Sequence, residues 1–461
     1  MKKGIIQIFF SNIIFLLFSV LNNFILPKYL SIDAYADFKT YILYSNYAGL
    51  LSFGFIEGMF LKYGGKILQQ AKEDHCGSAI RTFYFLQTFI VIFVFVLGVS
   101  LQNIMIVLFG LNAFSANIVN FYKNFSTATA EYKIYSISTC IEKAIIFAAN
   151  AVFIFLFRCN NYIVYSFIII AVLIIEIIYF TIMFEKQLPG IHKGRLNIPM
   201  MKEITTLGII LLLGNSVSAL FTGIDQWFIK LFMDKSSFAS YAFAVSMERV
   251  IIIFITPITT VLYNYFCQEK AGEHNDFLKH TLLIWSFFIL AMTYPLRWIV
   301  QTFIENYSDS VEIIFILFCG QAINCVINGI YVNKYKAEKR QNHFLKQMIL
   351  ITLLSIALNG LMYWLFHSMI GIATATLITK YIWLLWCEYD SKFYRYSFWE
   401  NIVIILLIFC FIASSQIHNS ILGFCVYFSI LAITVLLTMK ETCFRLIREV
   451  KGYLKTNRKD L

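Results

Sequence analysis

Apolar stretches of membrane-spanning length fill almost the whole chain, and the polar segments between them are short. A transmembrane helix needs roughly 20 apolar residues to cross about 30 Å of hydrocarbon, and about fourteen such stretches can be drawn here. They are 7–26, 38–60, 83–101, 104–124, 134–157, 161–183, 204–232, 238–266, 277–300, 310–333, 344–366, 369–388, 398–415 and 420–438. Lipid offers the backbone no hydrogen bonds, and runs such as 89–97 do not alternate as barrel strands do. We therefore predict an all-α polytopic membrane protein with about 14 transmembrane helices.

The distribution of lysine and arginine sets the expected orientation of these spans. With both termini in the cytoplasm, most of the 37 basic residues fall in inner loops and tails, as the positive-inside rule requires. Lys123, for example, falls in a predicted inner loop at 122–133. The formal net charge of +11 then reflects the cytoplasmic location of the loops and tails, and no nucleic-acid partner is expected. The basic C-terminal tail is expected to face the anionic lipids of the cytoplasmic leaflet. The outer side holds Lys28, Lys39, Arg158, Lys230, Lys235 and Arg297, and three basic residues lie within spans: Lys143, Arg249 and Lys380.

The patterns that mark cofactor and metal chemistry are missing from the sequence. It contains no CxxC pair, no HExxH and no GxxxxGK[ST], so neither a zinc site nor a disulfide framework nor a nucleotide cofactor is expected. Lys2 and Lys3 precede an apolar run, as in a signal peptide, but no small-residue cleavage site follows. We predict that this run is retained as the first helix.

Polar residues recur at corresponding places in the two halves of the chain. Sliding the second half back by 203 residues sets Asn12, Ser19 and Asn22 opposite Asn215, Thr222 and Asp225, along one helical face. A shift of 204 residues matches Asn117, Asn120 and Asn124 with Gln321, Asn324 and Asn328. Such stripes can also serve helix packing, but two at nearly one offset favour a duplication, a known transporter plan. The predicted parts are bundles of six helices at 1–183 and 204–390, a cytoplasmic linker at 184–203, two added helices at 391–438 and a basic tail at 439–461.

Several stretches resemble a known family. They are 53–58 (FGFIEG) running on to 62–66, Asp225 to Ile229 followed by 238–244, and Pro257 to Tyr263. With six plus six helices and two more at the C-terminal end, the chain resembles the polysaccharide-exporter branch of the multidrug/oligosaccharidyl-lipid/polysaccharide (MOP) superfamily, which includes the O-antigen flippases. The resemblance implies a pair of six-helix bundles around a cationic cavity that opens to each side in turn. It also implies a bacterial plasma-membrane location and a polyprenyl-(pyro)phosphate-linked oligosaccharide as the cargo, carried from the cytoplasmic to the outer leaflet. The expected partners are the glycosyltransferases and the polymerase of the same pathway.

The charges within spans are the candidate functional residues, because a charge near the bilayer centre is costly unless it is used. A diphosphate needs cations as it crosses, which Arg249, Lys380 and Lys143 can supply, and the amide faces Asn117, Asn120, Asn124, Gln321, Asn324 and Asn328 can line a glycan path. Coupling to H⁺ or Na⁺ would use a carboxylate, first Asp225 and then Glu248, Glu176 and Glu142. The alternative for each charge is a structural ion pair with another helix. Sequence neighbours such as Glu142 and Lys143 are not expected to pair with each other.

Two other functions remain open at this point. A drug or metabolite antiporter of the same superfamily would share the fold, although the three cations within spans favour an anionic cargo. A polytopic glycosyltransferase or O-antigen polymerase would be an enzyme, with Asp33 and Asp37 of the first predicted outer loop as its carboxylates. The predicted outer loops are too short to fold around a sugar, so we expect a transporter and no catalytic residues.

Overall fold

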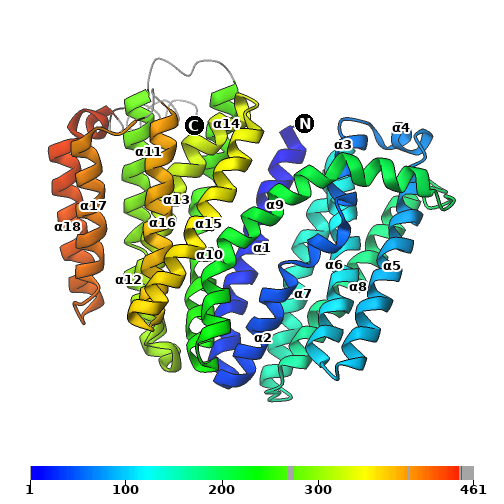
Figure 1. The fold of residues 1–461 in the computed structure, drawn as a ribbon, viewed down its shortest axis with the longest axis horizontal. Coiled ribbons are helices and arrows are strands. Elements are labelled where there is room, and N and C mark those ends of the chain that lie inside the picture. Colours follow the sequence, from blue (N-terminus) through cyan, green and yellow to red (C-terminus); the bar gives the residue numbers. More distant parts are fainter. Residues whose placement is uncertain (1, 268–274, 392–394, 446–447, 449–461) are drawn as a thin grey trace, which may run out of the picture. The chain divides into compact units, whose positions relative to one another are not determined.

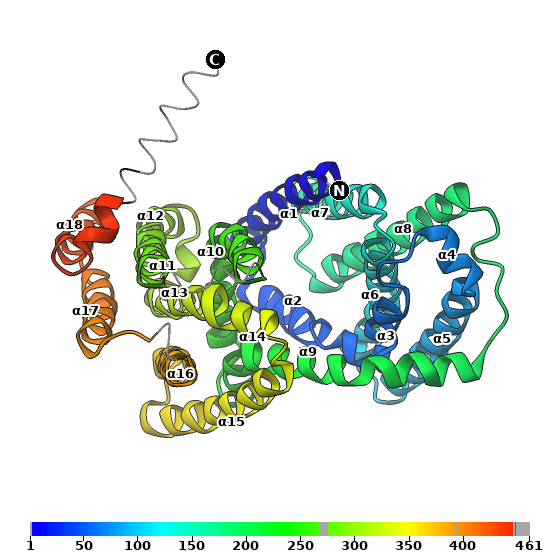
Figure 2. The same ribbon diagram turned by 90° about the horizontal axis from the view of Figure 1, so that it is seen from above.

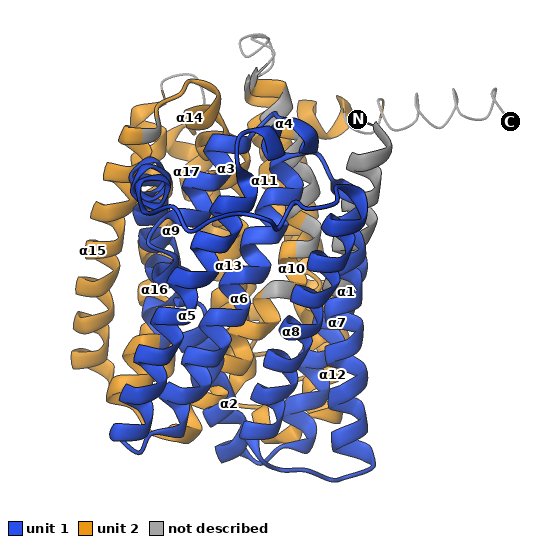
Figure 3. Cartoon of the chain, turned by 90° about the vertical axis from the view of Figure 1, so that its right-hand side faces the viewer, with its two compact units in different colours: residues 1–226 blue, residues 227–461 orange. Residues whose placement is uncertain are grey.

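The structure is a computed structural model, and it describes residues 2–267, 275–391, 395–445 and 448. Some side chains of α1 (Lys2–Tyr29) and α10 (Lys235–Cys267), and that of Gln341, lie outside the description as well. The described residues form helices joined by turns and loops, with no strand among them, as the sequence predicts (Figures 1 and 2). The chain divides into two compact units, residues 1–226 and 227–461 (Figure 3).

Ten helical segments of the described residues are long and apolar enough to span a membrane. A shorter apolar helix, α17 (Phe398–Ser414), adds to them, and α1 (Lys2–Tyr29) and α10 (Lys235–Cys267) are 28 and 33 residues long. At 1.5 Å of rise per residue, both exceed the thickness of the hydrocarbon. The protein is therefore a multi-pass helical membrane protein.

The first unit is a bundle in which long helices lie side by side (Figure 1). Helix α1 packs on α7, α5 packs on α6, and α8 packs against both α6 and α7. Aromatic side chains from several of these helices form its core, with Phe83 stacked on Phe121 at 5.1 Å and Tyr122 on Phe180 at 5.4 Å. The remaining helices of the unit are α2 (Ile32–Ser45), α3 (Phe55–Tyr63), α4 (Leu68–Glu73), α5 (Cys76–Ser100), α6 (Ile104–Ala128), α7 (Tyr132–Phe155), α8 (Tyr162–Gln187) and the first part of α9 (Ile198–Phe232).

The predicted continuous span at 38–60 is wrong, because the chain breaks between α2 and α3. A 3₁₀ turn at Ala48–Ser52 follows α2, and Phe53 and Gly54 then adopt φ of 51° and 83°, the left-handed region that glycine enters without strain. A break at membrane depth needs partners for its backbone carbonyls. Gln87 donates to Leu51 O at 3.0 Å and Asn117 donates to Ala48 O at 3.0 Å, so both side chains supply those partners. Asp33 and Asp37 lie in α2, and not in a loop.

Helices α3 and α9 approach so closely that only glycine fits at their crossing. A Cβ atom on Gly58 would lie 1.8 Å from the carbonyl oxygen of Ile204, and one on Gly208 would lie 1.9 Å from that of Gly54. The FGFIEG stretch therefore provides a backbone surface against which α9 packs. Lys62 of α3 also forms an ion pair of 2.7 Å with Glu203 of α9.

The second unit is built around α13 (Ser310–Val326). This helix packs against α10, α11, α12, α16 and α17. Of the most apolar stretch of residues within Ser310–Ala337, 89 % are buried, whereas the share is 22 % for the corresponding stretch of α15. A π-helical turn at Ile327–Val332 follows α13 directly. The unit also holds α11 (Asn275–Leu290), α12 (Thr293–Phe303), α14 (Asn333–Ala337), α15 (Gln341–Phe366), α16 (Met369–Asp390) and α18 (Ser420–Thr438).

Candidate functional site

Four charged side chains meet inside the first unit, and we call them the four-charge cluster: Lys123, Glu142, Lys143 and Glu176. Lys123 Nζ lies 2.6 Å from Glu142 Oε2 and 3.1 Å from Glu176 Oε1. Lys143 Nζ lies 2.6 Å from Glu142 Oε1. The hydroxyl of Ser138, one turn before Glu142 on α7, donates a hydrogen bond to Glu176. Two cations thus balance two carboxylates within one set of contacts.

The cluster is held by α6, α7 and α8, which carry Lys123, the Glu142–Lys143 pair and Glu176 respectively. Glu176 is the most deeply buried member, with 2 % of its side chain exposed, and Lys143 is the most accessible, with 25 %. Removing ions from water costs several kcal/mol each, so such a group is stable only while its charges stay matched. Lys143 is the member that can change partner with the least rearrangement.

Two expectations from the sequence are wrong here. Glu142 and Lys143 do pair with each other, because the long lysine side chain curls back to the neighbouring carboxylate. Lys123 lies in α6, which continues to Ala128, and not in a cytoplasmic loop. Its role was missed because it follows the last strongly apolar residues of that span. The available signal was its spacing of three residues from Asn120, which places it beside the amide stripe.

The second unit brings together two residues that were assigned separate roles. Lys380 of α16 has its Nζ 3.8 Å from Glu248 Oε1 of α10, and only 9 % of the lysine side chain is exposed. Its aliphatic stem packs against Gly320 of α13, where an added Cβ would lie 3.0 Å from Lys380 Cδ. Arg249 is part of α10, but its side chain lies outside the described residues.

The amide stripe of α6 divides into a bracing part and an accessible part. Asn117 is fully buried and donates to Ala48 O at 3.0 Å and to Gln87 Oε1 at 3.1 Å, which supports the α2–α3 break. Asn120 is exposed, and Asn124 is partly exposed and donates to the backbone of Asn120. Asn120 and Asn124 are therefore the accessible members of this stripe.

The amide stripe of α13 forms a ladder of side-chain hydrogen bonds. Asn324 donates to Gln321 Oε1 at 3.1 Å, and Asn328 donates to Asn324 Oδ1 at 2.7 Å. Asn328 lies in the π-helical turn. Such turns are rare and frequently occur at functional sites, because they displace side chains from regular helical positions.

The carboxylates of α3 and α9 lie in different surroundings. Asp225 is buried, with 5 % exposed, and its Oδ1 accepts a hydrogen bond of 2.7 Å from the backbone N–H of Gln226. Glu57 Oε1 accepts from Asn215 at 3.3 Å, so the α9 stripe contacts α3 at this point. Within the described part of the chain, no group of three or more His, Cys, Asp and Glu side chains is arranged to hold a metal ion.

Comparison with known proteins identifies the fold. No protein-family model and no curated protein sequence matches this chain. Among solved structures, it is similar to the lipid II flippase MurJ in an inward closed conformation, with 16 % identity, a TM-score of 0.66, and coverage of 96 % of this chain and 99 % of that one. It is also similar to an inward-facing multidrug resistance MATE family transporter of the MOP superfamily, with 10 % identity, a TM-score of 0.54, and coverage of 82 % of this chain and 94 % of that one. The chain therefore has the helical fold that this flippase and this transporter share.

Proposed function

We propose that this protein is a flippase for a lipid-linked oligosaccharide. It would carry a polyprenyl-(pyro)phosphate bearing an O-antigen, capsule or other surface repeat unit from the cytoplasmic to the outer leaflet of a bacterial plasma membrane. Transport would proceed by alternating access and would involve no covalent chemistry on the cargo.

The extent of the structural match carries this proposal. The MurJ structure covers 96 % of this chain, whereas the MATE structure covers 82 % of it while using 94 % of its own length. This chain therefore has a part that the flippase shares and the drug transporter lacks. The lipid-linked cargo in the name of that flippase, lipid II, supports a cargo of the same chemical class.

The four-charge cluster can serve an anionic headgroup by exchange of partners. A phosphate oxygen approaching Lys143 would replace Glu142 Oε1, and Glu142 would keep its contact with Lys123. Lys380, at 3.8 Å from Glu248, is the corresponding cation of the second unit, and Arg249 is a third. The lysine ammonium is a compact charge on a flexible side chain. A lysine–phosphate contact can therefore hold the headgroup and still release it, because it lacks the fixed two-point geometry of an arginine contact.

The same contacts give coupling to an ion a physical route. When the phosphate displaces a carboxylate from its lysine, that carboxylate can take up H⁺ or Na⁺ and so keep the local charge balanced. Glu142 holds this position in the first unit and Glu248 holds it in the second, while Glu176, which contacts Lys123, and Asp225 on α9 are further candidates. The accessible amides Asn120, Asn124 and Asn328 would replace water around the glycan, with Gln321 and Asn324 orienting Asn328.

A drug or metabolite antiporter is the second candidate, because the MATE fold also matches. The two candidates differ in the charge of the cargo. A cationic drug would need the carboxylates of the cluster to be exposed and the lysines withdrawn, which is the reverse of the exposure order of Lys143 and Glu176.

The test is a deletion strain whose lipid-linked sugars are extracted after labelling with a glycan reagent that does not cross the membrane. We expect one lipid-linked oligosaccharide to accumulate without label, and wild-type protein to restore labelling. Lys143→Ala and Lys380→Ala should fail to restore it. Lys133→Ala is the matched control, because Lys133 is an exposed lysine on the same helix as Lys143.

One result would overturn the proposed function, and another would overturn the proposed site. Normal labelling in the deletion strain, with a changed drug-efflux profile, would favour the antiporter. Full activity of Lys143→Ala, Lys380→Ala and Arg249→Ala together would remove the phosphate-binding role from the charges within the spans.

A further inference from the structure

Two carboxyl groups lie where α16 ends and α17 begins, and neither belongs to the charges discussed above. Glu388 is in the last turn of α16, and Glu400 is in the first turn of α17. Glu388 accepts a hydrogen bond from α17, whereas Glu400 forms its contacts with α11 and with the start of its own helix. The surroundings of the two groups differ, and the difference indicates which of them is ionised.

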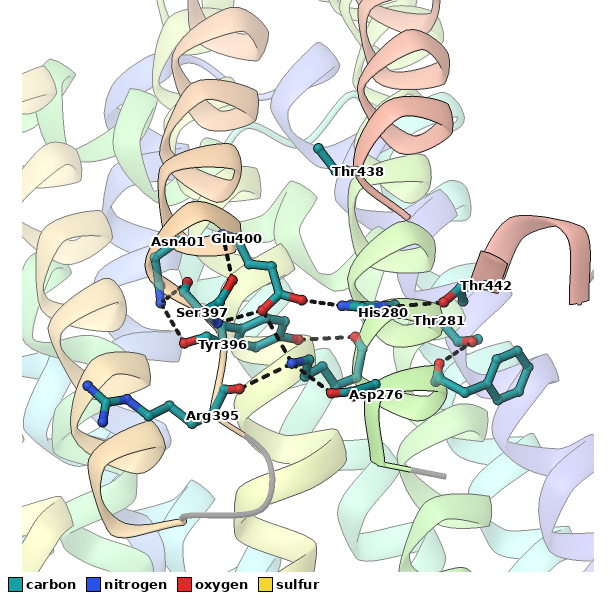
Figure 4. A network of polar contacts seen from close by, with 12 residues as sticks. Asp276, His280, Thr281, Arg395, Tyr396, Ser397, Glu400, Asn401, Thr438 and Thr442 are labelled. Atoms are coloured by element: carbon teal, nitrogen blue, oxygen red, sulfur yellow. Dashed lines mark hydrogen bonds and ion pairs between the residues drawn. The ribbon is translucent and has the colours of Figure 1, made fainter. Parts of the chain in front are cut away.

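Glu400 has the surroundings of an ionised carboxylate. Lys279 Nζ lies 3.2 Å from its Oε2, His280 contacts its Oε1, and the backbone N–H of Ser397 donates to Oε2 as well (Figure 4). His280 also contacts the hydroxyl of Thr442 (Figure 4). The first turn of a helix is the positive end of its dipole, which favours a negative charge further. Glu400 therefore has both side-chain and backbone donors to balance its charge.

Glu388 has no comparable set of donors. It is 3 % exposed, and its Oε2 accepts a hydrogen bond of 3.1 Å from Asn401 of α17. Its Oε1 is buried and has no hydrogen-bond partner among the described residues. No lysine, arginine or histidine in the described part of the chain forms an ion pair with it. Its place in the last turn of α16 is also the negative end of a helix dipole, which disfavours an anion.

The cations nearest to Glu388 are directed elsewhere. Lys279 of α11 is shared by Glu400 and Asp276, at 3.0 Å from Asp276 Oδ1, and it donates to the carbonyl oxygen of Arg395 at 3.1 Å (Figure 4). The side chain of Arg395 is exposed and extends away from these contacts (Figure 4). The other titratable groups that interact with Glu388 are uncharged or acidic: Tyr331 of the π-helical turn, Tyr381 and Cys387 of α16, Tyr396 and Glu400. They offer no positive charge to a Glu388 anion.

The amide of Asn401 shows which oxygen of Glu388 would carry a proton. Asn401 Oδ1 accepts from the hydroxyl of Tyr381 at 3.2 Å, and Nδ2 donates to the carbonyl oxygen of Ser397 at 3.3 Å. The N–H side of the amide therefore faces Glu388, so Oε2 is the acceptor and Oε1 is the position of the proton. A neutral carboxyl leaves one buried hydroxyl without a partner, whereas an ionised one leaves a buried charge with a single neutral donor. Burying the poorly paired ion costs far more.

We propose that Glu388 is a proton-binding site, neutral in the folded protein at neutral pH, and that loss of its proton weakens the contact between α16 and α17. The fold holds the proton because it offers the anion no counter-charge. When the contact opens, water solvates the carboxyl group and the proton is released. The contact is therefore strongest in acid and weakens as the pH rises. This site is independent of the proposed flippase function, which does not use Glu388.

The first experiment is infrared spectroscopy of the full chain in D₂O buffer at neutral pH, because a protonated carboxyl group has a C=O band above the amide I region. The difference spectrum of wild type minus Glu388→Gln should contain this band. Glu312→Gln is the matched control, since Glu312 is an exposed acid in the first turn of α13 and its loss should remove only ionised-carboxylate bands. Asn401→Leu should move the Glu388 band to higher wavenumber, because the C=O group loses its hydrogen-bond donor.

The second experiment measures the consequence for α17. The protection of the amides at residues 401–407, taken as the exchange rate relative to the intrinsic rate at the same pH, should fall as the pH rises above the ordinary carboxyl range. Glu388 contributes at most about tenfold per pH unit to this fall, the limit for release of one proton. Glu388→Gln cannot ionise and should lack that contribution, whereas Glu312→Gln should follow wild type. Lys279 and His280 are present in every variant, so the comparison isolates Glu388.

Loss of ionised-carboxylate bands, and not of the C=O band, in Glu388→Gln would overturn the assignment. If Glu388→Gln does not fold, Asn401→Leu decides the question, because a C=O band that this variant leaves unchanged does not come from Glu388. A protection profile that is the same in wild type and Glu388→Gln would overturn the effect of the proton on the α16–α17 contact.

Discussion

Replacing Lys123 by methionine removes the cation that contacts both carboxylates of the four-charge cluster. Glu142 keeps its 2.6 Å contact with Lys143, but Glu176 loses its lysine and retains only the Ser138 hydroxyl. Glu176 is 2 % exposed, so its charge is left in a buried position. Removing one partner of a buried ion pair costs about 3–5 kcal/mol, and methionine fills nearly the same volume, so little of this cost comes from a cavity.

The measurement is the free energy of unfolding of the purified protein in detergent, followed by intrinsic fluorescence. We expect Lys123→Met to lose about 3–5 kcal/mol, and the double variant Lys123→Met/Glu176→Gln to recover more than half of that loss. Lys133→Met, at an exposed lysine of α7, should stay within about 0.5 kcal/mol of wild type. Two results would refute the reasoning: a single variant as stable as wild type, or a double variant no more stable than the single one.

Three further predictions concern the first unit. Gly58→Ala places a methyl group against the α9 backbone and should cost about 1–3 kcal/mol or prevent folding, whereas Gly49→Ala, which meets open space, should cost under about 1 kcal/mol in the same unfolding assay. Asn117→Ala removes two buried hydrogen bonds, so it should destabilise the protein by about 2 kcal/mol and speed amide exchange at residues 46–54. Lys66 lowers the pKa of Asp74 outside the membrane, so their contact stabilises this loop above the ordinary carboxyl pKa and is lost as the pH falls through the lowered value. The protection of the amides at residues 66–74, measured as the exchange rate relative to the intrinsic rate at the same pH, should therefore fall only in acid. An Asp74→Asn variant whose protection has the same pH profile as wild type would contradict this.

The sequence predicts the helical class and most of the spans because lipid imposes one length and one composition on every crossing. Hydropathy over 38–60 as a whole does not reveal the break between α2 and α3. The local signal is the polar and glycine-rich run Asn46, Gly49, Ser52 and Gly54, and the flanking apolar residues outweigh it in a window of membrane-spanning length. The compensation for that break comes from Gln87 and Asn117, which are distant in sequence. Hydropathy alone therefore indicates that a segment lies within the membrane, but it does not show whether the helix in that segment is continuous.

The candidate site shows a similar division. The charges within spans were found as single residues, since each is costly in lipid, but their partners depend on helix packing that one sequence does not reveal. Lys123 was assigned to a loop because helix ends are hard to place near the interface. The stripe Asn117, Asn120 and Asn124 was recognised by its spacing, yet only the structure distinguishes the bracing residue from the accessible ones.

The π-helical turn at Ile327–Val332 changes which single-residue deletions this chain can survive. A π turn holds one residue more than an α turn, so removing a residue there returns the segment to α-helical hydrogen bonding. The side chains of α13 and α14 on either side would keep their present faces. A deletion within the regular part of α13 would instead rotate everything that follows by about 100° and turn buried residues outward. Length variation in this helix is therefore expected to fall on these six residues.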